Sequence, residues 1–130
     1  MVDERGDIAA MYKGIAQNDV GIRTDILCNV KKSIGMKMLI RSMAPKVIVA
    51  DEIGSKDDTD AICVAVCSGV KGIFTAHGAS LEDISLNKSL NELLKSHIIE
   101  RIIILNSREG KREVEKVYSL NKMNSEYIKL

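Results

Sequence analysis

The stretch Val47–Gly54, with the sequence VIVADEIG, decides the fold of this chain. Its first four residues are apolar and rich in β-branched side chains, and Pro45 lies just before them. Continuous apolar character of this kind predicts a strand covered on both faces, as in the parallel sheet of an α/β protein. Asp51 and Glu52 follow at the carboxyl end of this strand, where open α/β sheets bind their ligands.

An apolar strand that ends in Asp-Glu is typical of enzymes that hydrolyse nucleoside triphosphates. In that chemistry Asp51 would orient a magnesium ion through water, and Glu52 would position or deprotonate the water that attacks the γ-phosphate. The alternative interpretation is a strand that runs into an acidic turn, because short strings of this kind are common. The surrounding sequence has to decide between the two.

Composition and charge limit the class of protein. The chain has 130 residues, of which 45% are hydrophobic and 28% charged, as in one soluble globular domain. The formal net charge is +1 and 3% of the residues are aromatic, so direct binding of nucleic acid is not expected. Three cysteines, together with the lack of a long apolar run or a secretory leader, favour a cytoplasmic protein.

Helices are predicted on both sides of the central strand. Apolar residues at helical spacing predict a helix over residues 33–43. Ser55 and Asp58 resemble a capping box, and the helix that they begin runs to about Ser68 and is apolar almost all round, which predicts deep packing. Gly72–Gly78 is the next predicted strand, and a right-handed crossover would place it parallel to the first.

The two ends of the chain give weaker signals. Residues 1–2 predict the last step of a strand that breaks into an acidic turn, and residues 8–29 predict a long ordered loop. Toward the carboxyl end we expect a helical turn at 81–84, a helix at 88–96 and a hairpin with strands at 98–105 and 112–120. The predicted organisation is one mainly parallel α/β domain over residues 1–120, with a tail at 121–130.

Polar clusters follow three of the predicted strands. Asp3 and Glu4 follow the first strand, Asp51 and Glu52 follow the central one, and residues 75–78 follow the third. Because parallel neighbours place their carboxyl ends along one edge of a sheet, these clusters are expected to converge.

These clusters resemble the stage III sporulation protein AA family of endospore-forming bacteria, which is similar to the RecA-like secretion and pilus-motor ATPases. The resemblance rests on Val47–Gly54, on IRSMAP at 40–45 and on FTAHGASLEDI at 74–84, and it covers residues 2 to about 117. It implies a partial RecA-like core of the P-loop NTPase class. It also implies that Asp51 and Glu52 are the metal-orienting and catalytic acids of a Walker B motif.

The same resemblance assigns further site residues. Thr75 and His77 look like a histidine box that senses the γ-phosphate. Asp3 and Glu4 look like the remains of an acidic box that contributes to catalysis and cofactor binding. Arg41 looks like a phosphate-binding or intersubunit arginine.

The resemblance also implies a cellular setting. It implies ATP and Mg²⁺ as cofactors and a homo-oligomeric ring in which the ATP site lies between subunits, where Arg23 is a further candidate. It implies membrane-associated sporulation proteins as partners and a place on the mother-cell, cytoplasmic side of the membrane.

One departure from the family pattern matters more than these matches. The phosphate-binding sequence G-x-x-x-x-G-K-[ST] is absent from these 130 residues. Around Gly110 and Lys111, Leu105 stands where the first glycine belongs and Arg112 where Ser or Thr belongs. Weak or absent nucleotide binding is therefore expected. The chain is predicted to be the carboxyl-terminal part of an ATPase; the alternative is a non-catalytic assembly or regulatory module with a RecA-like surface.

Several of these residues also have plainer interpretations. A histidine that follows a strand is usually structural or exposed, and only the Thr-x-His-Gly context favours a functional role for His77. Cys63 and Cys67 share a helical face, but core packing is favoured over a metal site because further ligands are missing. The acids at 57–60 fit a solvated helix start that matches the helix dipole.

Overall fold

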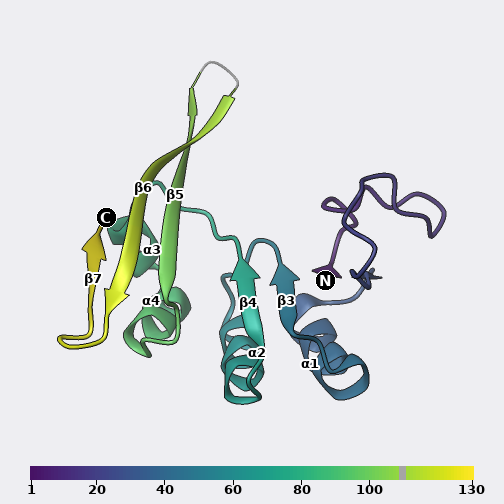
Figure 1. Ribbon diagram of the computed structural model, residues 1–130, viewed down its shortest axis with the longest axis horizontal. Helices are drawn as coiled ribbons and strands as arrows, with labels where there is room; N and C mark the ends of the chain where they lie inside the picture. The colour runs from purple at the N-terminus through teal and green to yellow at the C-terminus, as the bar shows by residue number, and fades with distance from the viewer. Residues whose placement is uncertain (109–110) are drawn as a thin grey trace. The chain divides into compact units, whose positions relative to one another are not determined.

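The computed structural model describes residues 1–108 and 111–130 and divides into two compact units, residues 1–76 and residues 77–130 (Figure 1). The first unit has a parallel sheet flanked by helices, and the second has helices followed by an antiparallel sheet. This mixed α/β architecture confirms the predicted fold class and is consistent with a partial RecA-like core.

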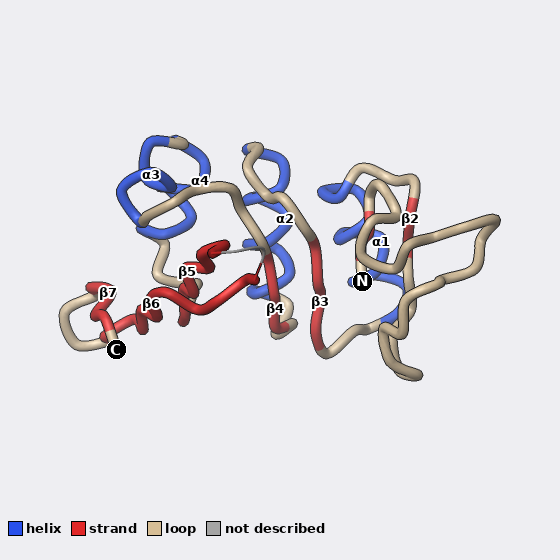
Figure 2. Tube along the Cα trace, turned by 90° about the horizontal axis from the view of Figure 1, so that it is seen from above, coloured by secondary structure: helices blue, strands red, loops and turns tan. Residues whose placement is uncertain are grey.

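From residue 27 onward, strands and helices alternate along the first unit (Figure 2). The order of its strands in the sheet is β2-β1-β3-β4, and every neighbouring pair is parallel. The elements are β1 (Val2–Asp3), β2 (Leu27–Cys28), α1 (Lys32–Met43), β3 (Val47–Ala50), α2 (Lys56–Cys67) and β4 (Lys71–Phe74). The central strand, both helices and the parallel pairing of β3 with β4 are therefore as predicted.

The central strand β3 is covered more fully on one face than on the other. Ile48 and Ala50 are fully buried, whereas Val47 is 46% exposed and Val49 is partly exposed. The prediction that both faces are covered was therefore wrong for the face that carries Val47. Helices α1 and α2 contact each other, and the alternation along β3 shows that the side chains at 48 and 50 share one covered face.

Helix α2 begins and ends as predicted but is buried along only one side. Ser55 and Asp58 form the capping box, and Gly69 follows the helix with a φ of +79°, a conformation that glycine adopts without strain. Ala61 and Ile62 are fully buried, yet Val64 is 46% exposed. The prediction of deep packing all round was therefore wrong on this side of the helix.

The second unit packs two helices with a three-stranded antiparallel sheet of order β5-β6-β7. Leu90, Leu93 and Ile104 form its buried apolar residues. Its elements are α3 (Leu81–Leu86), α4 (Lys88–Lys95), β5 (Arg101–Arg108), β6 (Lys111–Asn121) and β7 (Glu126–Lys129). Strand β7 lies in the segment that was predicted as a tail.

The predicted hairpin is present, but its first strand β5 runs to Arg108, beyond the predicted end at residue 105. Asn106, Ser107 and Arg108, predicted as part of the turn, continue β5 and pair with β6. The rest of the predicted turn, residues 109–110, lies outside the described residues. Within residues 1–108 and 111–130, the structure contains no helix with both the length and the apolar character needed to cross a bilayer.

Candidate functional site

Three strands of the first unit end at one edge of its sheet. Val2 of β1 pairs with Ala50 of β3, and Ala50 pairs with Phe74 of β4. Because all three strands are parallel, the residues that follow them lie along one rim. The predicted convergence of the carboxyl ends of β1, β3 and β4 is therefore confirmed.

Asp51 places a carboxylate oxygen at this rim with no partner from the protein. Its Oδ1 is buried and makes no hydrogen bond with any residue in the described part of the chain. A buried acceptor without a donor costs about 1–3 kcal/mol, so this oxygen is expected to take a donor from outside the described chain, such as a bound water. A water molecule held by a metal ion would supply the missing donor.

The carboxylate of Asp51 fits Mg²⁺ better than a metal ion that is held entirely by protein side chains. Among the described residues no three His, Cys, Asp or Glu side chains are grouped to hold a metal ion. Mg²⁺ commonly keeps several waters and takes one or two carboxylates together with phosphate oxygens. The single oxygen of Asp51 fits that mode, whereas zinc would need more protein ligands.

Glu52 is held at the rim through its backbone. Its φ is +48°, in the left-handed region that a non-glycine residue seldom adopts. The Glu52 N–H donates to Oγ1 of Thr75 at 3.0 Å, and the Ile53 N–H donates to the Thr75 carbonyl oxygen at 2.8 Å. Thr75, from the neighbouring strand end, therefore fixes the turn that carries Glu52.

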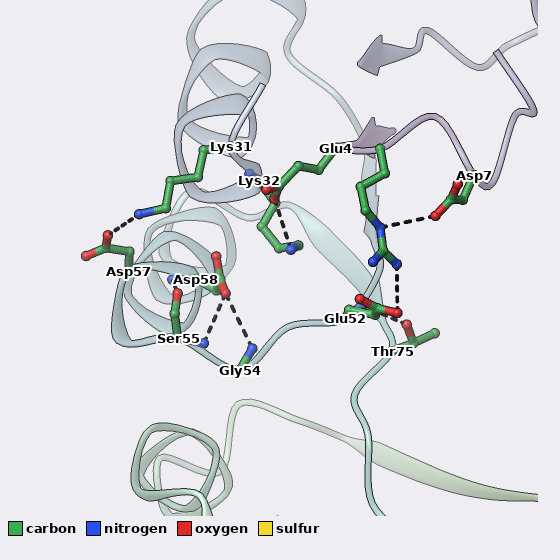
Figure 3. A network of polar contacts seen from close by, with 11 residues as sticks. Glu4, Asp7, Lys31, Lys32, Glu52, Gly54, Ser55, Asp57, Asp58 and Thr75 are labelled. Carbon is green, nitrogen blue, oxygen red and sulfur yellow. Dashed lines mark hydrogen bonds and ion pairs between the residues drawn. The ribbon is translucent and has the colours of Figure 1, made fainter. Parts of the chain in front are cut away.

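Arg5 reaches Glu52 from the end of the neighbouring strand β1. Its Nη2 lies 2.8 Å from Oε1 of Glu52, and its Nε lies 3.1 Å from Oδ2 of Asp7. Figure 3 draws the contacts that Asp7 and Glu52 make here. The hydrogen bond to Glu52, followed by the charges of Glu52 and Asp7, raises the pKa of Arg5. Arg5 directly follows Asp3 and Glu4 in the chain, but no sequence pattern indicated its contact with Glu52.

The Asp3 carboxylate anchors the loop that follows β1 through hydrogen bonds. It is completely buried, and its two carboxylate oxygens accept hydrogen bonds from the backbone N–H groups of Ile8 at 3.2 Å and Ala9 at 2.9 Å. Both oxygens are therefore occupied by the loop. A further role for Asp3 in nucleotide binding stays a prediction.

Glu4 joins the end of β1 to the start of α1. Its Oε2 accepts a hydrogen bond from the Lys32 backbone N–H at 3.0 Å and lies 3.0 Å from Nζ of Lys32 (Figure 3). The side-chain bond from Lys32, then the backbone bond, lowers the pKa of Glu4. The carboxylate therefore caps a helix in this structure, and its predicted catalytic role is untested.

The turn between Glu52 and α2 is tied to the helix start. Oδ2 of Asp58 accepts hydrogen bonds from the backbone N–H groups of Ser55 at 3.0 Å and Gly54 at 3.4 Å. Asp57 pairs with Lys31 at 2.9 Å, and this contact lowers the pKa of Asp57. Asp57 thus matches the predicted solvated helix start, whereas the prediction was wrong for Asp58, which is 4% exposed and holds the turn before the helix.

The structure does not place two of the predicted site residues, His77 and Arg41, beside these acids. His77 is exposed and belongs to the second unit, so its place beside Asp51 and Glu52 stays a prediction. Arg41 is exposed in the last turn of α1, which leads into the amino end of β3. That end of the strand is opposite the acidic rim, so the structure does not bring Arg41 to Asp51. Arg23 is exposed in the loop before β2.

Comparisons with known proteins match nearly the whole chain. The family described as "Sporulation stage III, protein AA" matches residues 1–124. The stage III sporulation protein AA of Bacillus subtilis (strain 168) is 40% identical over 118 residues. That match covers 91% of this chain and 38% of the relative, so the chain spans less than half of the relative's length.

Proposed function

Because the chain belongs to the stage III sporulation protein AA family, we propose that it supplies the carboxylate half of an ATP-hydrolysing site. In this proposal Asp51 orients Mg²⁺ through water, and Glu52 positions the water that attacks the γ-phosphate. The buried, unpartnered Oδ1 of Asp51 is the observation that carries the proposal. The parallel sheet supports it, because ligands of such sheets bind at the strand ends that carry these acids.

The phosphate-binding half of the site would come from residues outside these 130. The bound ion would neutralise the charge that develops on the phosphates and hold them in place. The residues of this chain would do three things: Asp51 accepts from the water around the ion, Glu52 accepts the proton of the attacking water, and Thr75 holds the backbone of Glu52 in place. His77 remains a candidate sensor of the γ-phosphate.

The wider biological role is also a proposal. The family resemblance supports a homo-oligomeric ring on the cytoplasmic face of a membrane-associated sporulation complex, in which ATP hydrolysis drives that complex. Arg41 and Arg23, both exposed, would then face neighbouring subunits. No contact with nucleic acid is proposed.

Metal binding can be tested on the chain itself. Mn²⁺, a paramagnetic substitute for Mg²⁺, should broaden the amide NMR signals of Ile53 and Gly54 at millimolar concentration. The broadening should be lost in Asp51→Asn. It should be kept in Asp60→Asn, a matched loss of one carboxylate that only breaks a surface ion pair with Lys56. Equal broadening in the Asp51 variant would contradict the proposed metal site.

Turnover requires a protein that carries these residues together with a phosphate-binding loop. In that protein Glu52→Gln should abolish ATP hydrolysis while leaving Mg-ATP binding intact, because the amide keeps the size of the side chain but cannot accept a proton. Wild-type turnover in Glu52→Gln would refute the catalytic assignment.

A second candidate function is a non-catalytic assembly module. Strand β4 is an edge strand of the sheet, and its Ile73 is 61% exposed. An edge strand with exposed apolar side chains can add a strand from a partner. Calorimetric titration with Mg-ATP separates the two functions in the protein that also carries a phosphate-binding loop, because tight binding there that is weakened in Asp51→Asn would contradict a purely structural module.

A further inference from the structure

We propose that Arg5 is the positioning residue for Glu52, holding its carboxylate at the rim beside Asp51 so that it faces the reacting water in a fixed orientation. The proposal rests on the proposed function and extends it to a residue that belongs to none of the predicted motifs. Its basis is the contact of 2.8 Å between Nη2 of Arg5 and Oε1 of Glu52, made between the ends of neighbouring strands.

The backbone around Arg5 is itself fixed. Gly6, with a φ of +76°, closes a turn that begins at Asp3, and its N–H donates to the Asp3 carbonyl oxygen at 3.1 Å. The buried carboxylate of Asp3 then holds the N–H groups of Ile8 and Ala9. Arg5 therefore lies inside a hydrogen-bonded turn, and the loop that follows this turn is anchored by Asp3, so the backbone of Arg5 is held in place at the rim.

The guanidinium of Arg5 is held by two carboxylates at once. Its Nε contacts Asp7 while its Nη2 contacts Glu52, so two different N–H groups of the planar fork are engaged. Asp7 and Glu52 therefore hold the guanidinium at two different nitrogens. An arginine with this arrangement restricts the partner carboxylate more than a lysine would.

Both ends of the Glu52 side chain are thereby constrained. The backbone is fixed by Thr75 in a left-handed conformation, and the carboxylate is fixed by Arg5. Residues that the surrounding structure holds in a strained backbone conformation are concentrated at functional sites, where they keep a catalytic group in place. The side chains of Arg5 and Glu52 are 57% and 39% exposed, so the effect of the pair should be moderate.

The first test measures the order of the Glu52 side chain in the 130-residue chain. We expect ¹³C relaxation to show a Glu52 methylene order parameter that is roughly a quarter to a half lower in Arg5→Gln than in the wild type. Lys37→Gln removes one positive charge from an exposed position of α1 and should leave the value unchanged. An unchanged order parameter in Arg5→Gln would overturn the proposal, whatever the chain catalyses.

The second test uses the protein that carries a phosphate-binding loop. Arg5→Gln should lower kcat by roughly three- to tenfold and leave the KM for ATP within about twofold, because the base is disordered while nucleotide binding is kept. Arg5→Lys should restore part of kcat. An increase in kcat would instead show that the contact with Arg5 inhibits Glu52, and it would refute a positioning role.

The two proposals fail in different ways. Turnover that survives Glu52→Gln removes the catalytic assignment, even if Arg5 orders the Glu52 side chain. Turnover that is lost in Glu52→Gln but unchanged in Arg5→Gln removes the role of Arg5 and leaves the catalytic assignment in place.

Discussion

The backbone N–H of Glu52 donates a hydrogen bond of 3.0 Å to the hydroxyl oxygen of Thr75, across the carboxyl ends of β3 and β4. The same two strand ends are joined by the Ile53 N–H, which donates to the Thr75 carbonyl oxygen, and by the Thr75 N–H, which donates to the Ala50 carbonyl oxygen. Glu52 therefore keeps its positive φ because a neighbouring strand end holds the turn around it.

Replacing Thr75 tests this relationship. Thr75→Val keeps the side-chain shape but removes the acceptor, so the free energy of unfolding should fall by about 0.5–1.5 kcal/mol. Hydrogen exchange at the Glu52 amide should become faster than in the wild type. Thr75→Ser retains a hydroxyl and should show slow exchange. Fast exchange in both variants would mean that the methyl group, and not the hydrogen bond, fixes the turn.

Close packing of α1 on β1 gives a second prediction. A Cβ atom at Gly35 would lie 2.7 Å from Cγ1 of Val2, a residue that is completely buried. Alanine normally stabilises a helix by about 1 kcal/mol relative to glycine. Here the clash should outweigh that gain, and Gly35→Ala should lower the free energy of unfolding by about 1–3 kcal/mol in urea titrations.

The matched control for Gly35→Ala removes the methyl groups that it meets. Adding Val2→Ala should recover part of the lost free energy, since the two residues are in direct contact and their effects should not add. A double variant whose loss equals the sum of the two single losses would contradict this packing.

The parts of the fold that could be predicted are those with a local signal. The apolar run at 47–50, the capping box at Ser55 and the helical spacing before Pro45 each depend on neighbours in the sequence, and each predicted element is present. Strand β2 has two residues, and β7 has the sequence EYIK, so neither carries a continuous apolar run like that of β3. Asn106 has a turn-forming side chain but lies in β5, because pairing with β6 overrides its local preference.

The candidate site could be predicted only in part, for a similar reason. Asp51 and Glu52 follow a recognisable strand, so the sequence identifies them. The contact between Arg5 and Glu52 joins two exposed side chains far apart in the chain, and no spacing rule indicates it. Likewise, the structural use of Asp3 depends on where its loop returns, which the residue types do not specify.

The contact between Glu4 and Lys32 predicts a pH dependence of stability. Lys32 lowers the pKa of Glu4 in the folded chain below its ordinary value of 4.5. The contribution of this carboxylate is therefore complete above about pH 4.5 and is lost as the pH falls through the lowered value. Glu4→Gln should be less stable than the wild type in urea near pH 7, and the difference should shrink toward about pH 3.

An exposed pair serves as the control for this pH dependence. Asp57 also has a lowered pKa because of Lys31, but both side chains are more than half exposed. Asp57→Asn should therefore change stability little at any pH. A difference for Glu4→Gln that stays constant down to about pH 3 would show that ionisation of Glu4 is not what stabilises the start of α1.

Two acids at neighbouring strand ends should respond to removal in opposite ways. Asp3→Ala deprives the N–H groups of Ile8 and Ala9 of their acceptors, so the free energy of unfolding should fall by about 2–4 kcal/mol. Asp51→Ala removes a buried oxygen that has no donor in the described chain, so stability without metal should be unchanged or rise by up to about 1 kcal/mol. Urea unfolding with and without Mg²⁺ measures both effects, and Mg²⁺ should stabilise the wild type but not Asp51→Ala. A large loss of stability in metal-free Asp51→Ala would show that the fold itself uses this carboxylate, and the proposal that it is kept for a bound ion would then lose its main support.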